Sequence, residues 1–170
     1  MPQKKNYSVI DSESICIRRF QDKDLPYVKK MMQSQEVMRH TGFKKPQSEE
    51  QIHKHFNDWK NRINSPFGVW AIEESTNKIC VGWIMLKYTE FHQPEVGFMI
   101  SRNEWNKGYA TKALKLMLNY ATKTLELTTV IARVNKDNMS SINVLMKSEM
   151  NQISKDSFNN DNLYFEFKTF

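Results

Sequence analysis

The sequence predicts an α+β fold in which one mixed, mostly antiparallel sheet carries helices on both faces. Two observations lead to this prediction. Between Phe67 and Ile100, short apolar runs bounded by turn residues follow one another without a helix, and helical periodicity occurs both before and after them. The chain has 170 residues, which suits one sizeable core. We therefore expect a single domain over residues 1–170.

The first third of the chain predicts one strand and two helices. The strand is expected at Ser14–Arg18, followed by a helix over Asp22–Met32 that is capped by its first residue. A polar loop is expected over Gln33–Gln47. A second helix is predicted over Ser48–Asn61, because its first four residues have the capping-box pattern.

The rest of the chain predicts a meander followed by alternating helices and strands. The meander strands are expected at Val69–Ile72, Ile79–Leu86 and Val96–Ile100. A long helix over Gly108–Lys123 has apolar residues at 3.6-residue spacing. A strand, a short helix and a last strand are expected at Thr129–Val134, Ser140–Lys147 and Leu163–Phe167, and the residues near Asn151–Ser154 are compatible with one more strand.

Composition narrows the function classes. The formal net charge of +6 is spread along the chain, with 14 basic against 10 acidic residues in 1–85 and 11 against 9 in 86–170, and no basic tail occurs. No apolar run approaches the roughly 20 residues that cross a bilayer, and no secretory signal is visible, so we expect a cytoplasmic protein. Cys16 and Cys80 stand alone in apolar segments and are interpreted as core residues.

The loop before the long helix is the most informative part of the sequence. A helix start offers unpaired N–H groups and the positive end of the helix dipole to a phosphate. Here the loop holds Asn106, which tolerates a left-handed conformation, together with the small residues Gly108 and Ala110. The loop therefore predicts either a phosphate site or an ordinary strand-to-helix turn. It contains neither a Walker loop nor a GxGxxG fingerprint.

Three segments resemble the motifs of a known family. Glu95–Ile100 with Trp105–Leu114 looks like the central motif of the GNAT N-acetyltransferases, and Asn138–Leu145 resembles their second motif. The similarity is greatest to the branch of the RimJ/RimL-type ribosomal-protein N-terminal acetyltransferases. The resemblance implies the GNAT fold, with two parallel strands splayed at the cofactor site. It also implies an enzyme that uses acetyl-coenzyme A as co-substrate and no metal.

The resemblance also implies which residues bind the coenzyme. Its pyrophosphate would meet the N–H groups of Asn106, Lys107, Gly108, Tyr109, Ala110 and Thr111. Its pantetheine arm would pair with the backbone around Met99, Ile100 and Ser101, between the strands Val96–Ile100 and Val130–Val134. A β-bulge would point the N–H of Phe98 or Met99 at the thioester oxygen. Asn138 would contact the pantetheine arm, cap the following helix, or do both.

The catalytic groups follow from the same comparison. Glu95 stands where the family often places a base, although a strand-end salt bridge is the alternative, and His92 is a rival base. Many members carry a tyrosine acid where this chain has Leu145. Ser141 is then the nearest hydroxyl in register, either bonding the coenzyme sulfur or capping its helix. His53 and His55 are two residues apart on a predicted helix, so they do not form a metal pair.

The predicted function is acetyl transfer to a primary amine, either a protein N-terminus or a small amine, in a monomer or homodimer. The acceptor would lie against Gln33–Gln47 and Ser48–Asn61. Their carboxylates either attract a cationic substrate or are solvated helix charges: Glu36, Glu49, Glu50 and Asp58. Two alternatives stay open. One is a non-catalytic acetyl-coenzyme A sensor. The other is an RNA-associated basic module that uses Lys4, Lys5, Arg18, Arg19, Lys44 and Lys45.

Overall fold

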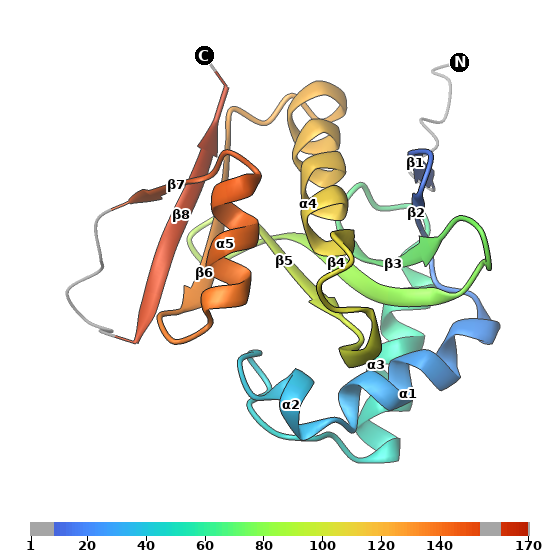
Figure 1. Cartoon of the computed structure of the whole chain (residues 1–170). Coiled ribbons are helices and arrows are strands. Elements are labelled where there is room, and N and C mark those ends of the chain that lie inside the picture. Colours follow the sequence, from blue (N-terminus) through green and yellow to red (C-terminus); the bar gives the residue numbers. More distant parts are fainter. Residues whose placement is uncertain (1–8, 154–160, 170) are drawn as a thin grey trace, which may run out of the picture.

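The computed structural model describes residues 9–153 and 161–169, and its strands form one open sheet (Figure 1). The order of the eight strands in the sheet is β1-β2-β3-β4-β5-β6-β8-β7. Neighbouring strands are antiparallel except β5 and β6, which are parallel. The predicted mixed, mostly antiparallel sheet is therefore confirmed. The strands are β1 (Val9–Asp11), β2 (Ile15–Arg18), β3 (Gly68–Glu74), β4 (Cys80–Tyr88), β5 (Pro94–Ile100), β6 (Thr129–Asn135), β7 (Asn151–Ile153) and β8 (Asn162–Lys168).

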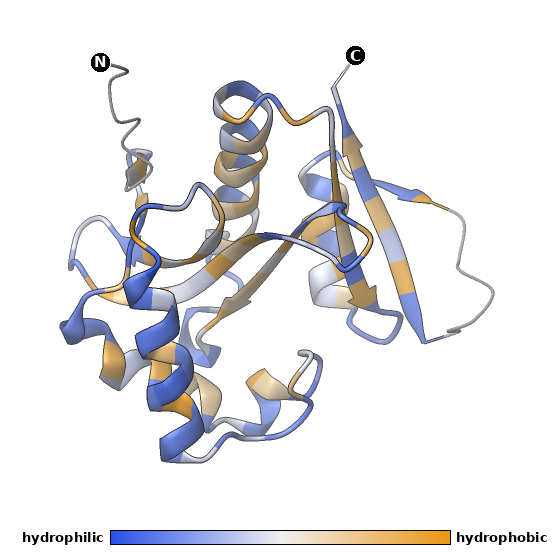
Figure 2. Cartoon of the chain, turned by 180° about the vertical axis from the view of Figure 1, so that it is seen from behind, coloured by the Kyte–Doolittle hydropathy of each residue, from blue (hydrophilic) through white to orange (hydrophobic). Residues whose placement is uncertain are grey.

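Helices cover both faces of the sheet, as predicted. One face carries α4 (Tyr109–Asn119), which ends in a π-helical turn, and α5 (Met139–Lys147). The other face carries α1 (Leu25–Met32), α2 (Gln35–Met38) and α3 (Glu49–Asn61). Figure 2 shows these helices from the opposite side. Within the described residues, no helix combines the length and apolarity needed to span a bilayer.

The two faces form two separate apolar clusters because side chains alternate along each strand. Trp70 and Ile72 of β3 pack in the α4–α5 cluster, whereas Ala71 between them packs against α1 and α3. Phe56 of α3 and Met117 of α4 are both almost fully buried, one in each cluster. The sheet is thus a buried central layer, which explains why its strands are apolar runs rather than simple alternations.

The structure adds short elements to the predicted ones. A strand at Val9–Asp11 pairs with β2, and β7 confirms the strand that Asn151–Ser154 allowed, although Ser154 lies outside the described residues. Part of the predicted loop Gln33–Gln47 is the helix α2. Its N-terminus is capped by Ser34, whose Oγ accepts a hydrogen bond from the Val37 N–H at 3.3 Å, and its apolar residues are buried.

The predicted cap of the first helix is wrong. The chain enters α1 through a 3₁₀ turn at Asp22–Asp24, so Asp22 lies inside the turn rather than before it. Asp24 occupies the N-cap position of α1 without a side-chain bond into that helix; its Oδ2 accepts a hydrogen bond from the Gln21 N–H at 2.8 Å, which is part of a capping box around the 3₁₀ turn. The capping box predicted at Ser48 is confirmed, with Ser48 Oγ 3.3 Å from the Gln51 nitrogen.

The predicted β-bulge in β5 is also wrong. The register between β4 and β5 runs without a shift from Gly82–Ile100 to Tyr88–Pro94, and the irregularity lies between β3 and β4 at Ile72/Glu73. Gly82 lets β5 approach this closely: a Cβ built on Gly82 would lie 2.3 Å from the Met99 carbonyl oxygen. Because β4 holds β5 in uninterrupted register, the gap beside β5 arises where β6 turns away.

We predict that Gly82→Ala destabilises the protein by about 1–3 kcal/mol, because the new methyl group forces the β5 backbone away from β4. Urea unfolding followed by far-UV circular dichroism measures this. Gly42→Ala is the matched control, since a Cβ at Gly42 has no neighbour within 4 Å. Equal stability of the two variants would contradict the close approach at Gly82.

A buried ion cluster joins the first helix to the sheet. The guanidinium of Arg18 donates to both oxygens of Asp24, at 2.7 and 2.9 Å, and from Nε to Glu73 at 2.9 Å. Lys23 Nζ reaches the same Glu73 oxygen at 2.9 Å. Burial by itself would raise the pKa of Glu73, but the hydrogen bonds from Arg18 and Lys23 outweigh it and hold that pKa below the ordinary value of 4.5. The carboxylates of Asp24 and Glu73 thus compensate the positive charge of the buried Arg18 guanidinium.

The sign of this shift predicts a pH dependence. A carboxyl whose folded pKa is depressed stabilises the fold above its ordinary pKa, and this contribution is lost as the pH falls through the folded value. At pH 7 we expect Glu73→Gln to lose about 1–3 kcal/mol of unfolding free energy. The difference from wild type should shrink below about pH 4.5. Denaturant titrations from pH 7 to pH 3 measure this, with exposed Glu50→Gln as control. A difference that stays constant with pH would refute the assignment.

Candidate active site

The parallel strands β5 and β6 meet at one register position and then separate. Glu95 of β5 pairs with Ile131 of β6, and the residues that follow in these two strands form no further β5–β6 pair. The Ser101 N–H donates to Val81 of β4 at 2.8 Å. Since N–H groups alternate in direction along a strand, those of Phe98 and Ile100 point away from β4, toward the gap that opens beside β6. The backbone N–H and C=O groups of Met99 and Ser101 thus point toward β4, and those of Phe98 and Ile100 point toward the gap.

One gap-facing group of β5 already has a partner. The indole Nε1 of Trp105 donates to the Ile100 carbonyl at 2.8 Å. The guanidinium of Arg102 stacks over the Trp105 ring, 4.6 Å from its centroid, and pairs with Glu36 of α2 at 2.7 Å. From the sequence alone, Trp105 had no predicted role beyond its position in the motif. The family's central motif has a basic or amide residue at this position. The tryptophan found there instead was the sequence signal for a distinct role of Trp105.

The turn into α4 has the geometry of an anion-binding nest. Asn106 has φ 63° and Gly108 has φ 81°, so both are left-handed, as expected for Asn106. A Cβ built on Gly108 would have no neighbour within 4 Å, so the turn is open above this residue. The first backbone bond of α4 runs from the Lys112 N–H to the Gly108 carbonyl at 3.1 Å. The N–H groups of the first helical turn therefore project from the helix end.

Lys107 lies in this turn but has a partner. Its Nζ is 2.9 Å from Glu104 Oε2, and this hydrogen bond raises the pKa of Lys107. Both side chains are close to the nest, so Lys107 adds a positive charge that Glu104 partly offsets. Backbone N–H groups and the helix dipole are then the main attraction for a phosphate at this turn.

The second predicted motif lies at the start of α5. Asn138 Oδ1 accepts a hydrogen bond from the Ser141 N–H at 3.2 Å, which confirms Asn138 as the cap of this helix. Ser141 is therefore not the cap, and its half-buried hydroxyl lies in the first turn. Both α4 and α5 begin at the end of the sheet where β5 and β6 separate (Figure 1).

Glu95 sits at the apex of the separating strands. It is 7% exposed, and the Nε of Arg133 on β6 lies 3.9 Å from its Oε1. The side chains of Glu95 and Met99 share a strand face, and Met99 packs with α1–α3, so the carboxylate lies on the face opposite α4 and α5. His92, the rival base, lies in the exposed turn before β5, beyond the closed end of the strand pair.

Other candidate groups do not converge on this site. Burial raises the pKa of both Cys16 and Cys80 to about 12, so neither thiol acts as a nucleophile at neutral pH. Across residues 9–153 and 161–169, His, Cys, Asp and Glu side chains form no group of three that could hold a metal ion. Arg18 and Arg19 are each 7% exposed, so two of the six cations of the RNA alternative are not at the surface.

The carboxylates predicted to attract a cationic acceptor are also dispersed. Glu36 pairs with Arg102, and Glu49 pairs with Lys29 at 3.2 Å. Glu50 and Asp58 are exposed on α3. Solvated or paired helix charges explain these carboxylates better than a cation site does.

Arg133 was not predicted as a site residue. The sequence signal for it was a single charged residue inside the apolar run Val130–Val134.

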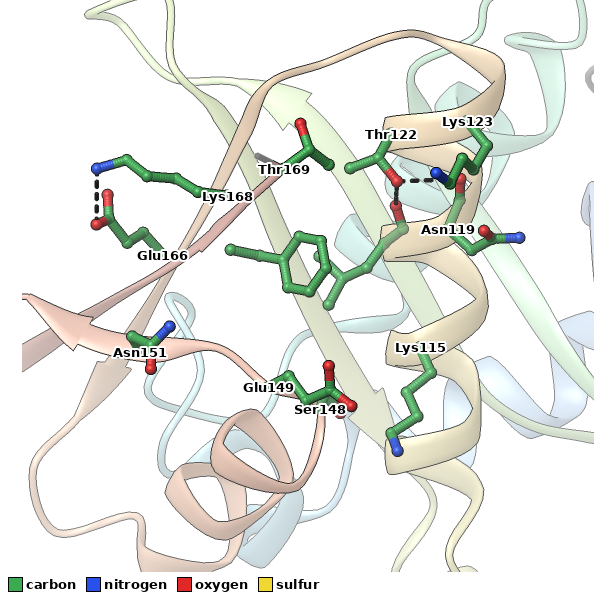
Figure 3. A pocket seen from close by; sticks show the side chains of 12 residues that line it. Lys115, Asn119, Thr122, Lys123, Ser148, Glu149, Asn151, Glu166, Lys168 and Thr169 are labelled. Carbon is green, nitrogen blue, oxygen red and sulfur yellow. Dashed lines mark hydrogen bonds and ion pairs between the residues drawn. The ribbon is translucent and has the colours of Figure 1, made fainter.

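A groove of about 990 Å³ lies elsewhere on the α4–α5 face. Figure 3 shows Lys115 and Lys123 on one side of this groove, Glu149 at the end of α5 below, and Thr169 after β8 opposite. It lies toward the C-terminal ends of both helices. None of the residues predicted to bind the coenzyme lines it, because those residues gather at the N-terminal ends of the two helices.

Comparison with known proteins assigns a class to this geometry. A sequence profile of the acetyltransferase (GNAT) domain matches residues 14–151, which include the separating strands, the nest and the start of α5. The protein is therefore an acyltransferase of the class that uses acetyl-coenzyme A. The chain belongs to the acetyltransferase (GNAT) family. It is 29% identical over 145 residues to the uncharacterized N-acetyltransferase YnaD of Bacillus subtilis (strain 168), covering 83% of this chain and 81% of YnaD.

Solved structures share the fold. A GNAT-family acetyltransferase from Bacillus anthracis superposes with a TM-score of 0.81 at 24% identity, covering 94% of this chain and 98% of that one. RimL, a ribosomal L7/L12 α-N-protein acetyltransferase in complex with coenzyme A, gives 0.78 at 11% identity over 95% and 98%. A spermidine N-acetyltransferase from Vibrio cholerae, in complex with coenzyme A and spermine, gives 0.75 at 16% identity over 92% and 96%. The GNAT fold predicted from the sequence is thus confirmed.

We predict that Gly108→Glu weakens acetyl-coenzyme A binding by about tenfold or more, because it places a carboxylate where the nest would meet phosphate. Isothermal titration calorimetry measures the dissociation constant. Asn57→Glu adds the same charge on the exposed surface of α3 and should bind like wild type. Tight binding by Gly108→Glu would contradict the nest assignment.

Proposed function

We propose that this protein transfers the acetyl group of acetyl-coenzyme A to a primary amine by direct attack in a ternary complex. The observation that carries the proposal is the separation of β5 from β6 beside Glu95, with the nest at the same end of the sheet. We also propose that the acceptor is an N-terminal or small-molecule amine and that the chain is of the RimJ/RimL type.

The described residues fit the coenzyme on three counts. The nest at Asn106–Thr111 is open and lined by N–H groups, which suits the pyrophosphate. The backbone of Phe98 and Ile100 faces the gap, which suits the amide groups of a pantetheine arm. Asn138, at the start of α5, lies at the same end of the sheet (Figure 1). When bound, the coenzyme would supply a thioester whose carbonyl carbon a neutral amine can attack.

The chain's own groups account for the rest of the chemistry. An ammonium has no lone pair, so a base has to take its proton, and the Glu95 carboxylate stands at the apex of the gap for this role, directly or through a water molecule. The Phe98 N–H faces the gap and can donate to the thioester oxygen as that oxygen gains negative charge. Met99 is the less suitable donor because its N–H points toward β4.

The departing thiolate also needs a proton. Leu145 stands at the position where many family members have a tyrosine, and it is 2% exposed, so no acid is available there. Ser141 and water are the remaining donors near the start of α5. This missing acid is the one observation that favours the second candidate, an acetyl-coenzyme A sensor without turnover.

The test is a thiol-release assay after calorimetric demonstration of acetyl-coenzyme A binding. Glu95→Gln should lower kcat by about 100-fold at neutral pH, the usual size of a general-base contribution, and leave coenzyme affinity unchanged. Glu90→Gln, in the exposed turn before β5, is the matched control. An unchanged rate in Glu95→Gln would move the base to His92, water or the substrate. Binding without release by the wild-type protein would favour the sensor.

A further inference from the structure

Arg133 occupies a special position beside the proposed acceptor amine. It lies on β6 two residues beyond Ile131, the residue that pairs with Glu95, and thus where the strands have already separated. Its Nε is 3.9 Å from Glu95 Oε1, so its side chain is on the same face as the proposed base. The side chain is 54% exposed, whereas that of Glu95 is 9% exposed. A guanidinium therefore stands at the open side of the base.

This guanidinium keeps its hydrogen-bonding capacity. The 3.9 Å separation from Glu95 exceeds the 2.7–3.2 Å of a hydrogen bond, so the contact is electrostatic. The planar fork of an arginine binds a carboxylate through two parallel hydrogen bonds. Tyr164 lies directly across from Arg133 in the antiparallel pair of β6 and β8, and it is half-buried on the same face.

The charges around this opening have a positive excess. Helix α2 and the segment that follows it lie across the separated ends of β5 and β6 (Figures 1 and 2). Between Val37 and Ser48 the sequence has no acidic residue, and its cations Arg39, Lys44 and Lys45 are exposed. The neighbouring acids are already paired: Glu36 with Arg102 at 2.7 Å, and Glu166 with Lys168 at 2.9 Å.

From this arrangement we infer that the acceptor carries a carboxylate close to its amine and that Arg133 binds that carboxylate. The inference rests on the proposed acetyl transfer and names the class of its acceptor. The attacking amine would lie against Glu95 while its neighbouring carboxylate meets the Arg133 fork. A polyamine lacks such a group and would meet the positive side of the opening. Two sources supply this chemistry, a free amino acid and a peptide with an acidic residue after its N-terminus.

Matched acceptor pairs test the inference and separate the two sources. One pair is alanine and alaninamide. The other is Ser-Asp-Ala-amide and Ser-Asn-Ala-amide, and spermidine serves as the polycation. Rates of thiol release, expressed per unprotonated amine, give kcat and KM for each. We expect wild type to prefer the carboxylate member of at least one pair by about tenfold or more in kcat/KM.

Arg133→Gln should reduce this preference to less than about twofold, mainly by raising the KM of the carboxylate member. Arg133→Lys, which keeps the charge but loses the fork, should fall between them. Lys54→Gln on exposed α3 removes the same charge elsewhere and should retain the preference. An acetyl-coenzyme A affinity equal to that of wild type, measured by calorimetry, shows that Arg133→Gln is folded.

Several outcomes overturn the inference without touching the proposed function. They are equal use of both members of each pair, a preference for spermidine, and a preference that survives in Arg133→Gln. By contrast, absence of acetyl-coenzyme A binding in calorimetry overturns the proposed function itself. Binding without release for every acceptor contradicts both.

Discussion

The unequal pairing of β5 is the constraint on which the site depends. On one side β4 holds it in continuous register over its whole length, and on the other side β6 meets it at one position. A buried strand normally has backbone partners on both edges, because an unpaired buried N–H or C=O costs free energy comparable to a lost hydrogen bond. The edge of β5 beyond Glu95 is thus a row of backbone groups with capacity for an extended ligand.

The surrounding elements keep this edge open. Gly82 permits β4 and β5 to stay in close contact, so β5 cannot relax toward β6. Helix α4 packs against β4 and β5, α5 packs against β6, and the two helices share one apolar cluster and begin where the strands part (Figure 1). On the other face the Arg18 cluster fixes the start of α1 to β3. The gap therefore opens at one end of a continuously packed core, and the functional groups lie along its rim.

Much of this architecture was predictable from the sequence, because long periodic segments and motif spacing specify it locally. The strands of the meander, the capping box at Ser48 and the left-handed Asn106 all follow from short-range patterns. Features that depend on tertiary contacts were not predictable. Helix α2 has four residues, too few for a periodic pattern, and is fixed by the burial of Val37 and Met38. The uninterrupted β4–β5 register depends on a glycine facing another strand.

The candidate site divides in the same way. The nest could be placed because one contiguous segment forms it. The direction of the β5 N–H groups could not, since it depends on which residues bond to β4. The Glu95–Arg133 contact likewise joins residues 38 positions apart in the chain, and only the parallel pairing of their strands brings them together.

The chain of contacts from Glu36 through Arg102 and Trp105 to Ile100 has a consequence for working conditions. It ties α2, on the acceptor side, to the strand edge that faces the coenzyme, and its outer step is an ion pair whose side chains are 51% and 55% exposed. Such a pair is worth about 0–1 kcal/mol and weakens with added salt, while the indole bond and the apolar packing of α2 do not. Added salt therefore weakens the link between α2, on the acceptor side, and the β5 edge that faces the coenzyme. This effect is independent of any charge on the substrates.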